Sequence, residues 1–198
     1  MKKQRLATGC YYHVYNRGNN KENIFKEAEN YIYFLKLWNK YIEPVAETFC
    51  YCLLPNHFHF FIRMRELQTF EVFKTSKVLT QPNQEQHFSN FFNAYSKAIN
   101  KAYNRTGSLF QKGFKRKEII NESYYTSIIG YIITNPVRHG LCNSSAEYLY
   151  SAYEAILSDK TTLLLRNEVI DWFGCKEAFI DYIRAYESNL PDKYELLK

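Results

Sequence analysis

The sequence of 198 residues lacks any long apolar run. No segment approaches the roughly eighteen consecutive apolar residues that a membrane-spanning helix requires. Residues 1–10 carry several basic side chains. The segment that follows them is aromatic and lacks the apolar stretch of a secretory signal peptide. With 46% hydrophobic residues, the chain can still bury one substantial core. We therefore expect a folded cytoplasmic protein with no membrane partner.

The sequence also lacks any Cys-x-x-Cys pair. An odd number of cysteines without such pairs does not suit a disulfide framework, and it fits unpaired thiols in a reducing compartment. The cysteines are Cys10, Cys50, Cys52, Cys142 and Cys175. We expect most of them to serve as small apolar residues.

Acidic residues are absent from one long stretch, residues 86–117. The stretch is rich in Lys and Arg, with aromatic residues such as Phe92 and Tyr95 between them. Such cations can meet the phosphates of a nucleic acid while the rings stack on unpaired bases. Arg17 and Arg138 lie outside this stretch but are added to the set. The candidate nucleic-acid-binding residues are Arg17, Lys97, Lys101, Arg105, Lys112, Lys115, Arg116 and Arg138. A solvated helix face above core aromatics is the alternative interpretation.

The charge is divided unevenly along the chain. Residues 1–142 hold 20 Lys and Arg against 10 Asp and Glu, whereas residues 143–198 hold 6 against 10. The two parts therefore carry about +10 and −4. We interpret residues 1–142 as the functional domain and residues 143–198 as an acidic helical extension that packs on it or regulates it.

The order of predicted elements indicates the fold. Strands are expected at 11–17, 46–53, 57–64 and 114–120, helices at 27–42 and 88–104, and a long loop at 65–86. This β-α-β-β-α-β order predicts an α+β, ferredoxin-like split βαβ fold, in which both helices cover one face of an antiparallel sheet. Further helices are expected at 122–134, where Pro136 ends or kinks the helix, and at 144–157 and 175–187.

Two histidines interrupt the aromatic strand that follows Pro55 and Asn56. Because side chains alternate across a strand, Phe58 and its apolar neighbours can face the helices while His57 and His59 point to the open face. Two parallel imidazoles on an open face are candidate metal ligands.

The helix expected at 122–134 offers two further functional side chains. Tyr131 and Asn135 are four residues apart and therefore lie on one helix face. If this helix covers the open face of the sheet, a phenol and an amide are presented together to the two histidines.

Several of these motifs resemble one family, the REP-associated tyrosine transposases, within the insertion-sequence-200-like, single-tyrosine HUH transposases. The resemblance covers most of residues 11–153, through "YYHVYNRGN", "LLPNHFHFFI", "RTGSLFQKGFK", "YIITNPVRHGL" and "SAEYLYSAY". It implies that His57 and His59 are the metal ligands, that Asn135 is the third ligand, and that Tyr131 is the nucleophile that becomes linked to a DNA 5′-phosphate. It further implies a Mg²⁺ or Mn²⁺ cofactor, single-stranded or hairpin DNA as partner, and a monomer or homodimer.

The chemistry of phosphodiester cleavage suits these residue types independently. A divalent cation polarises the phosphoryl oxygen and stabilises the leaving oxygen. Imidazole ligands favour a transition metal such as Mn²⁺, whereas Mg²⁺ is implied by the family. A tyrosine ester conserves the phosphodiester bond for reversal by a 3′-hydroxyl. The phenol, with an ordinary pKa of about 10, needs a proton acceptor that the sequence does not identify.

Other assignments stay open at this stage. Tyr95, Tyr103, Tyr124 and Tyr125 are rival nucleophiles, and His13 and His139 receive no catalytic role. A structural zinc module built from Cys50, Cys52, His57 and His59 is one alternative function. The other is a nucleic-acid-binding protein that has the fold but does not cleave.

The chain departs from the family pattern after Leu109 and Phe110. Relatives commonly have Gln, Gly, Arg and an aromatic residue there, whereas this chain has "QKGF". The missing arginine would have to be replaced by Lys112 or Arg116.

Overall fold

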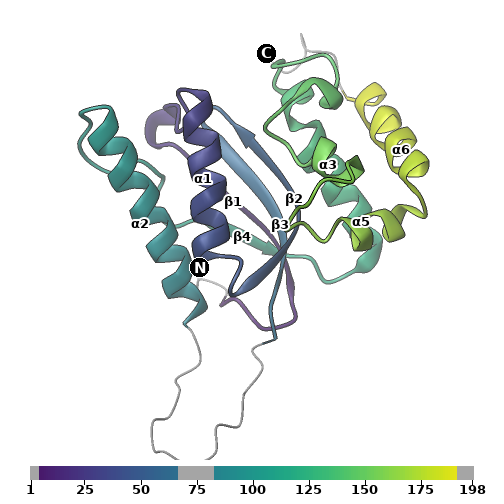
Figure 1. Cartoon of the computed structure of the whole chain (residues 1–198), viewed down its shortest axis with the longest axis horizontal. Helices are drawn as coiled ribbons and strands as arrows, with labels where there is room; N and C mark the ends of the chain where they lie inside the picture. The colour runs from purple at the N-terminus through teal and green to yellow at the C-terminus, as the bar shows by residue number, and fades with distance from the viewer. Residues whose placement is uncertain (1–4, 67–82, 191–198) are drawn as a thin grey trace, which may run out of the picture.

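The computed structural model describes residues 5–66 and 83–190 (Figure 1). The domain predicted from the element order consists of β1 (Tyr11–Arg17), α1 (Ala28–Tyr41), β2 (Ala46–Leu54), β3 (His57–Met64), α2 (Gln84–Ala102) and β4 (Lys115–Glu118). It is followed by α3 (Tyr125–Arg138), α4 (Tyr153–Leu157), α5 (Arg166–Phe173) and α6 (Lys176–Ser188). Short 3-10 turns lie at Asn19–Lys21, Glu122–Tyr124 and Ser145–Glu147.

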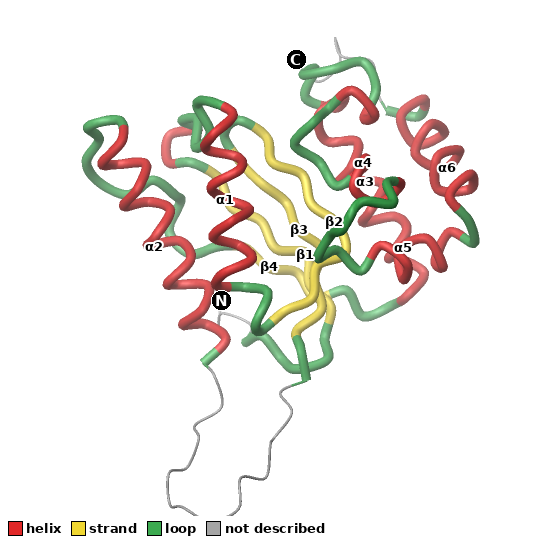
Figure 2. The backbone as a smooth tube through the Cα atoms, viewed as in Figure 1, coloured by secondary structure: helices red, strands yellow, loops and turns green. Residues whose placement is uncertain are grey.

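The four strands form one antiparallel sheet in the order β2-β3-β1-β4. Helices α1 and α2 cover one face, and α3, α5 and α6 lie on the other side (Figure 1; Figure 2). The predicted α+β fold with an antiparallel sheet is confirmed. Because the hydrogen-bonded centre of the sheet is β3 and β1, residues on these two strands meet in the middle of both faces.

The alternation of side chains along β3 separates two apolar cores. Phe58 and Phe60 point toward α1 and α2, where the Trp38 ring stacks on Phe60 with centroids 3.6 Å apart. Phe61 points the other way, into a core that contains Phe49 of β2 and Tyr125 of α3. The sheet is therefore a middle layer, and its α3 side holds the predicted site.

The helix that carries Tyr131 and Asn135 differs from its predicted boundaries. It begins at Tyr125 and continues through Pro136 to Arg138. The amide groups that follow Pro136 still find helical acceptors, since His139 N donates to Asn135 O. Proline removes one donor but does not end the helix here.

The region after residue 142 also differs in part from prediction. Residues 148–152 are not helical: they form a turn and a short bridge beside β2, where Ala152 N donates to Tyr51 O and Leu53 N donates to Tyr150 O. These bonds cover the free edge of β2, which would otherwise expose unpaired backbone groups. Helix α5 was not predicted, whereas α6 agrees with the helix expected at 175–187.

The loop predicted at 65–86 lies largely outside the described residues, which resume at residue 83. Its last predicted residues belong to α2, whose N-cap Asn83 accepts a hydrogen bond from Gln86 N through its side chain. Among the described residues, no helix is both long and apolar enough to cross a membrane. The domain boundary at residue 142 stays a prediction; the second core contains residues from both sides of it, including Ile129 and Phe179.

Candidate active site

The centre of the open sheet face carries a group of stacked rings. In the antiparallel register, Tyr15 of β1 lies opposite His59 of β3, and Arg17 lies opposite His57. The His13 and His59 rings are stacked with centroids 5.1 Å apart, and Tyr15 stacks on His13 at 4.8 Å. The predicted placement of the two histidines opposite the Phe58 face thus agrees with the strand register.

Helix α3 brings the predicted tyrosine and asparagine to these rings. The Tyr131 ring lies 5.6 Å from His59 and 5.8 Å from His13, measured between centroids. Asn135 is fully buried one turn later, and its Nδ2 donates to Tyr131 O at 2.6 Å. The helical spacing of four therefore does bring both side chains to one face, as expected.

Hydrogen bonds orient the two candidate ligand imidazoles. His57 Nδ1 lies 2.6 Å from Asn56 Oδ1, and His59 Nδ1 lies 2.9 Å from His13 Nε2. Both bonds engage Nδ1, so that Nε2 is the nitrogen left for another partner. Hydrogen bonding of the second nitrogen is the usual way in which proteins fix the tautomer of a metal-binding histidine.

Two buried atoms of the candidate metal ligands lack a hydrogen-bond partner within the described part of the chain. They are His59 Nε2 and Asn135 Oδ1. A buried acceptor without a partner is costly, and such atoms call for a water or an ion. A neutral imidazole nitrogen and an amide oxygen are both cation ligands, so the donor set fits a divalent metal.

Burial keeps the histidines of the site neutral. It lowers the pKa of His57 to about 4, with further lowering by His139 and Arg17. It lowers the pKa of His13 to about 4, with a smaller contribution from Lys117, and it holds the pKa of His59 well below the usual value. Neutral imidazole is the form that binds a metal ion.

Two arginines add positive charge beside the candidate nucleophile. The Arg138 guanidinium lies 5.5 Å from the centroid of the Tyr131 ring, and the Arg17 charge acts on His57 and His139. The Nε atoms of both arginines are buried and find no acceptor among the described residues. Inward-facing N–H donors of this kind are suited to an anion such as a phosphate.

The remaining predicted nucleic-acid contacts divide into two groups. Lys97, Lys101, Lys112 and Lys115 are exposed. Arg105 is instead paired with Glu22, and the Arg116 side chain, only 3% exposed, is paired with Glu85. The protein itself therefore neutralises the two arginines, and their contact with a nucleic acid stays a prediction. Lys97 and Lys101 lie on α2, across the sheet from Tyr131 (Figure 1).

The sequence analysis missed three residues at this site: His13, Asn56 and Lys117. Lys117 lies opposite His13 in the sheet and so shares its face, whereas Arg116 lies opposite Val14 and faces the helices. Strand alternation applied to β1 and β4, as it was to β3, would have identified His13 and Lys117. Asn56 could not be found this way, because it acts from the turn before β3.

A pocket of about 650 Å³ opens beside these residues. Its floor is the sheet face, and its walls come from α3 and the connection between β4 and α3. Its lining residues are His13, Tyr15, His59, Lys117, Glu118, Ile119, Ile120, Asn121, Tyr124, Ser127, Ile128 and Tyr131. The candidate nucleophile is thus accessible from a cavity of the size that small ligands occupy.

The rival tyrosines have different surroundings. Tyr95 is buried and donates to Ile24 O, Tyr125 is buried in the second core, and Tyr103 donates to Glu27. Tyr124 is 61% exposed and lines the same pocket as Tyr131. Tyr124 is therefore the rival that an experiment must separate from Tyr131.

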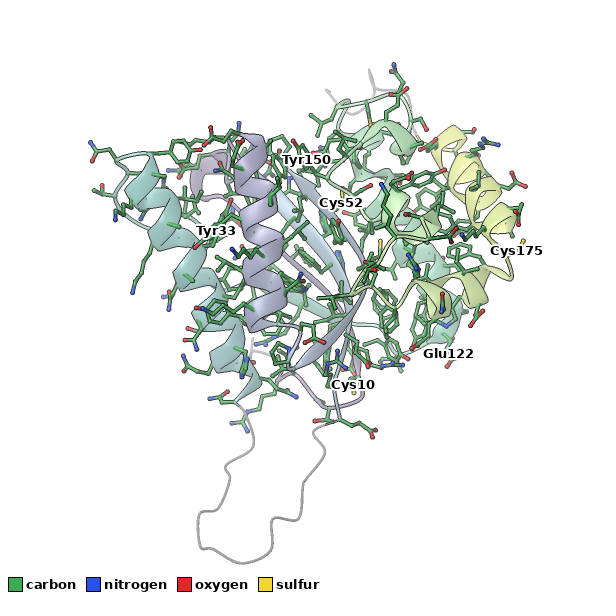
Figure 3. All side chains as sticks on the ribbon, in the orientation of Figure 1. Cys10, Tyr33, Cys52, Glu122, Tyr150 and Cys175 are labelled. Carbon is green, nitrogen blue, oxygen red and sulfur yellow. The ribbon has the colours of Figure 1, made fainter. Side chains whose placement is uncertain are left out.

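The zinc interpretation receives no support from the cysteines. Cys50 and Cys52 are fully buried in the second core, and burial raises the pKa of both thiols, so they are neutral. Across residues 5–66 and 83–190, no group of three or more Cys, His, Asp and Glu side chains is arranged to hold a metal ion. Cys52 is buried near the sheet, whereas Cys175 is exposed at the outer edge of the molecule, by the C-terminal helix (Figure 3).

Comparisons with known proteins agree with the fold. No protein-family model and no curated protein matches the sequence. Among solved structures, the chain is similar to one described as a REP-associated tyrosine transposase bound to a REP hairpin. The TM-score is 0.60 at 14% sequence identity, and the match covers 80% of this chain and 86% of the other. At this identity, the likeness shows a shared fold.

Proposed function

We propose that this protein is a transposase-like enzyme that cleaves and rejoins single-stranded DNA through a metal-assisted 5′-phosphotyrosine intermediate. The observation that carries the proposal is the meeting of two distant elements: the Tyr131 ring of α3 lies beside His59 of β3, the His57 ring lies 5.2 Å from His59, and the Asn135 amide is bonded to Tyr131 O one helical turn away. One of the imidazole nitrogens and the amide oxygen are buried without a partner among the described residues. Polar atoms that are buried without a partner do not help an apolar core to pack, so a purely structural role does not explain them.

We assign His57, His59 and Asn135 as the ligands of a Mg²⁺ or Mn²⁺ ion. Such an ion, when bound, supplies Lewis-acid polarisation of the phosphoryl oxygen and stabilisation of the leaving oxygen. His13 and Asn56 hold the two imidazoles through their Nδ1 atoms. Their role is to fix which nitrogen faces the cation.

Tyr131 acts as the nucleophile. Its phenol gives its proton to water, and the phenolic oxygen attacks phosphorus. The new oxygen–phosphorus bond forms while the bond from phosphorus to the DNA 3′ oxygen breaks, and that oxygen takes up a proton to become a 3′-hydroxyl. Attack by a 3′-hydroxyl on the phosphotyrosine reverses the step, so rejoining needs no ATP.

Arg17 and Arg138 are suited to orient the phosphate that is attacked. Their buried Nε donors lie near the histidines and near the Tyr131 ring, where an anionic phosphate has to approach. Charge-assisted hydrogen bonds from guanidinium to phosphate are short and directional. This arrangement favours nucleic acid as the substrate over a neutral ligand.

The partner we propose is a DNA strand that contains a hairpin. The similar solved structure is described as bound to a REP hairpin, and the likeness in fold supports the same class of partner here. Tyr131 and the histidines come from one chain and lie together, which favours a site that a monomer can complete by itself. A homodimer is compatible with this assignment.

The proposal is tested by incubating the protein with labelled single-stranded DNA hairpins and either Mn²⁺ or Mg²⁺. We expect a covalent protein–DNA adduct that requires the divalent ion and is absent in EDTA. Tight binding of the DNA with no cleavage under any metal condition would favour the alternative, a nucleic-acid-binding protein that does not cleave.

A further inference from the structure

The pocket beside Tyr131 contains features that cleavage chemistry alone does not require. Two large apolar side chains on its wall are strongly exposed, Ile120 at 87% and Tyr124 at 61%. Both belong to the connection between β4 and α3, near the labelled Glu122 in Figure 3. Exposed apolar residues that gather at a cavity indicate a surface that is covered by a ligand.

The pocket combines flat rings with polar side chains. On the sheet side, the Tyr15 ring stacks against His13 and His59. On the helix side, Tyr124 offers a second ring, and Asn121 and Ser127 offer an amide and a hydroxyl group. An occupant that matches this lining has apolar flat faces and a polar edge.

We propose that this pocket binds one unpaired nucleobase, that of a nucleotide next to the cleaved phosphate. This inference rests on the proposed function, since it takes Tyr131 as the nucleophile. A nucleobase has two π faces for the rings and hydrogen-bonding groups along its edge. Lys117, exposed on the adjoining strand, meets the phosphate of the same nucleotide.

The location and size of the pocket restrict the occupant further. Because Tyr131 itself lines the pocket, the occupant is attached directly to the phosphate that Tyr131 attacks. A base inside a duplex has both faces covered by its neighbours and cannot stack on protein rings. A volume of about 650 Å³ lies within the range for small-molecule sites, which suits a single nucleotide. The pocket therefore selects for single-stranded DNA at the cleavage position.

The test uses Tyr131→Phe protein, which binds without cleaving, and a set of oligonucleotides with one abasic site at each successive position. We expect one abasic position to weaken binding by about 5- to 100-fold, the range for a stacked base. Tyr124→Ala should weaken binding of the intact oligonucleotide by a similar factor, and it should have no further effect on the oligonucleotide that is abasic at that position. Tyr124→Phe should retain binding.

Tyr33→Ala is the matched control, because Tyr33 is also exposed but lies on α1, across the sheet. It should bind every oligonucleotide as the parent does. If no abasic position matters, or if Tyr124→Ala binds normally, the base pocket is wrong. In parallel, adduct formation is measured with protein that retains Tyr131, and this result reports separately on the proposed function. An adduct without an abasic effect rejects the pocket alone, and an abasic effect without an adduct rejects the cleavage chemistry.

Discussion

At the scale of single residues, the site depends on which imidazole nitrogen is left for a metal. His59 is buried and bonded to His13, whereas His57 is partly exposed and bonded to Asn56. Removal of His57 therefore disturbs packing least, and His59 substitutions also remove core contacts. The roles of ligand and of orienting partner can be separated by variants of these residues.

We predict that His57→Ala abolishes stoichiometric Mn²⁺ binding, as measured by titration calorimetry, with cooperative unfolding retained. His13→Ala should weaken Mn²⁺ binding by about 10- to 100-fold, the usual effect of removing an outer partner of a ligand. Cys50→Ala with Cys52→Ala is the control, and it should bind Mn²⁺ normally if it folds. Loss of metal binding in the cysteine variant as well as in His57→Ala would support the zinc module instead.

A second residue-scale prediction concerns strand β4. Lys115 and Lys117 lie opposite Tyr15 and His13 on the site face, so each can neutralise a DNA phosphate. Replacement of both by Ala should flatten the slope of log affinity against log salt by up to about 1.4, since each phosphate contact on single strands contributes about 0.7. Lys36→Ala with Lys40→Ala, on α1, should leave the slope unchanged. Equal slopes in both double variants would mean that β4 does not contact DNA.

At the scale of elements, the parts that could be predicted are those fixed by local periodicity. The spacing of Tyr131 and Asn135 and the alternation around His59 are set by helix and strand geometry alone. The contact of His13 with His59 depends on pairing between strands 46 residues apart, which local patterns do not encode. The path of residues 148–152 along the free edge of β2 likewise depends on hydrogen bonds to a distant part of the chain.

Helix α3 is held against α6 by a close approach at Gly130. A Cβ atom there would lie 2.9 Å from ring atoms of both Tyr182 and Tyr186. We predict that Gly130→Ala lowers stability by up to about 2 kcal/mol, because overpacking costs about 1–3 kcal/mol and the gain in helix propensity offsets about 1 kcal/mol of it. A thermal melt measures this effect, and Tyr186→Ala should reduce it. Unchanged or raised stability in Gly130→Ala would show that α6 can move away without cost.

At the scale of the whole molecule, the acidic C-terminal region packs on the side of α3 that carries Ile129 and Ile133. Ile129 and Ile133 of α3 share one core with Phe179 and Ile183 of α6. Residue Arg63 of β3 is also paired with Glu168 of α5 at 3.1 Å. Residues beyond 142 therefore complete the packing around the helix that carries Tyr131.

A chain that ends at residue 142 should consequently lose cooperative unfolding, because the apolar face of α3 is then exposed to water. Circular dichroism during a thermal melt, with dye binding to exposed apolar surface, measures this loss. The full chain with Lys160→Ala, an exposed change in the same region, is the control. A truncated chain that melts cooperatively at the original temperature would mean that residues 1–142 fold independently.

The central claim for the whole molecule is that Tyr131 becomes linked to DNA. The most direct measurement is mass spectrometry of peptides from protein incubated with a single-stranded hairpin substrate and Mn²⁺. We predict a phosphodiester-linked nucleotide on the peptide that contains Tyr131, a free 3′-hydroxyl on the other fragment, and no adduct from Tyr131→Phe, which still binds metal and DNA. An adduct that persists in Tyr131→Phe or maps to Tyr124, or cleavage with no adduct at all, would contradict the account.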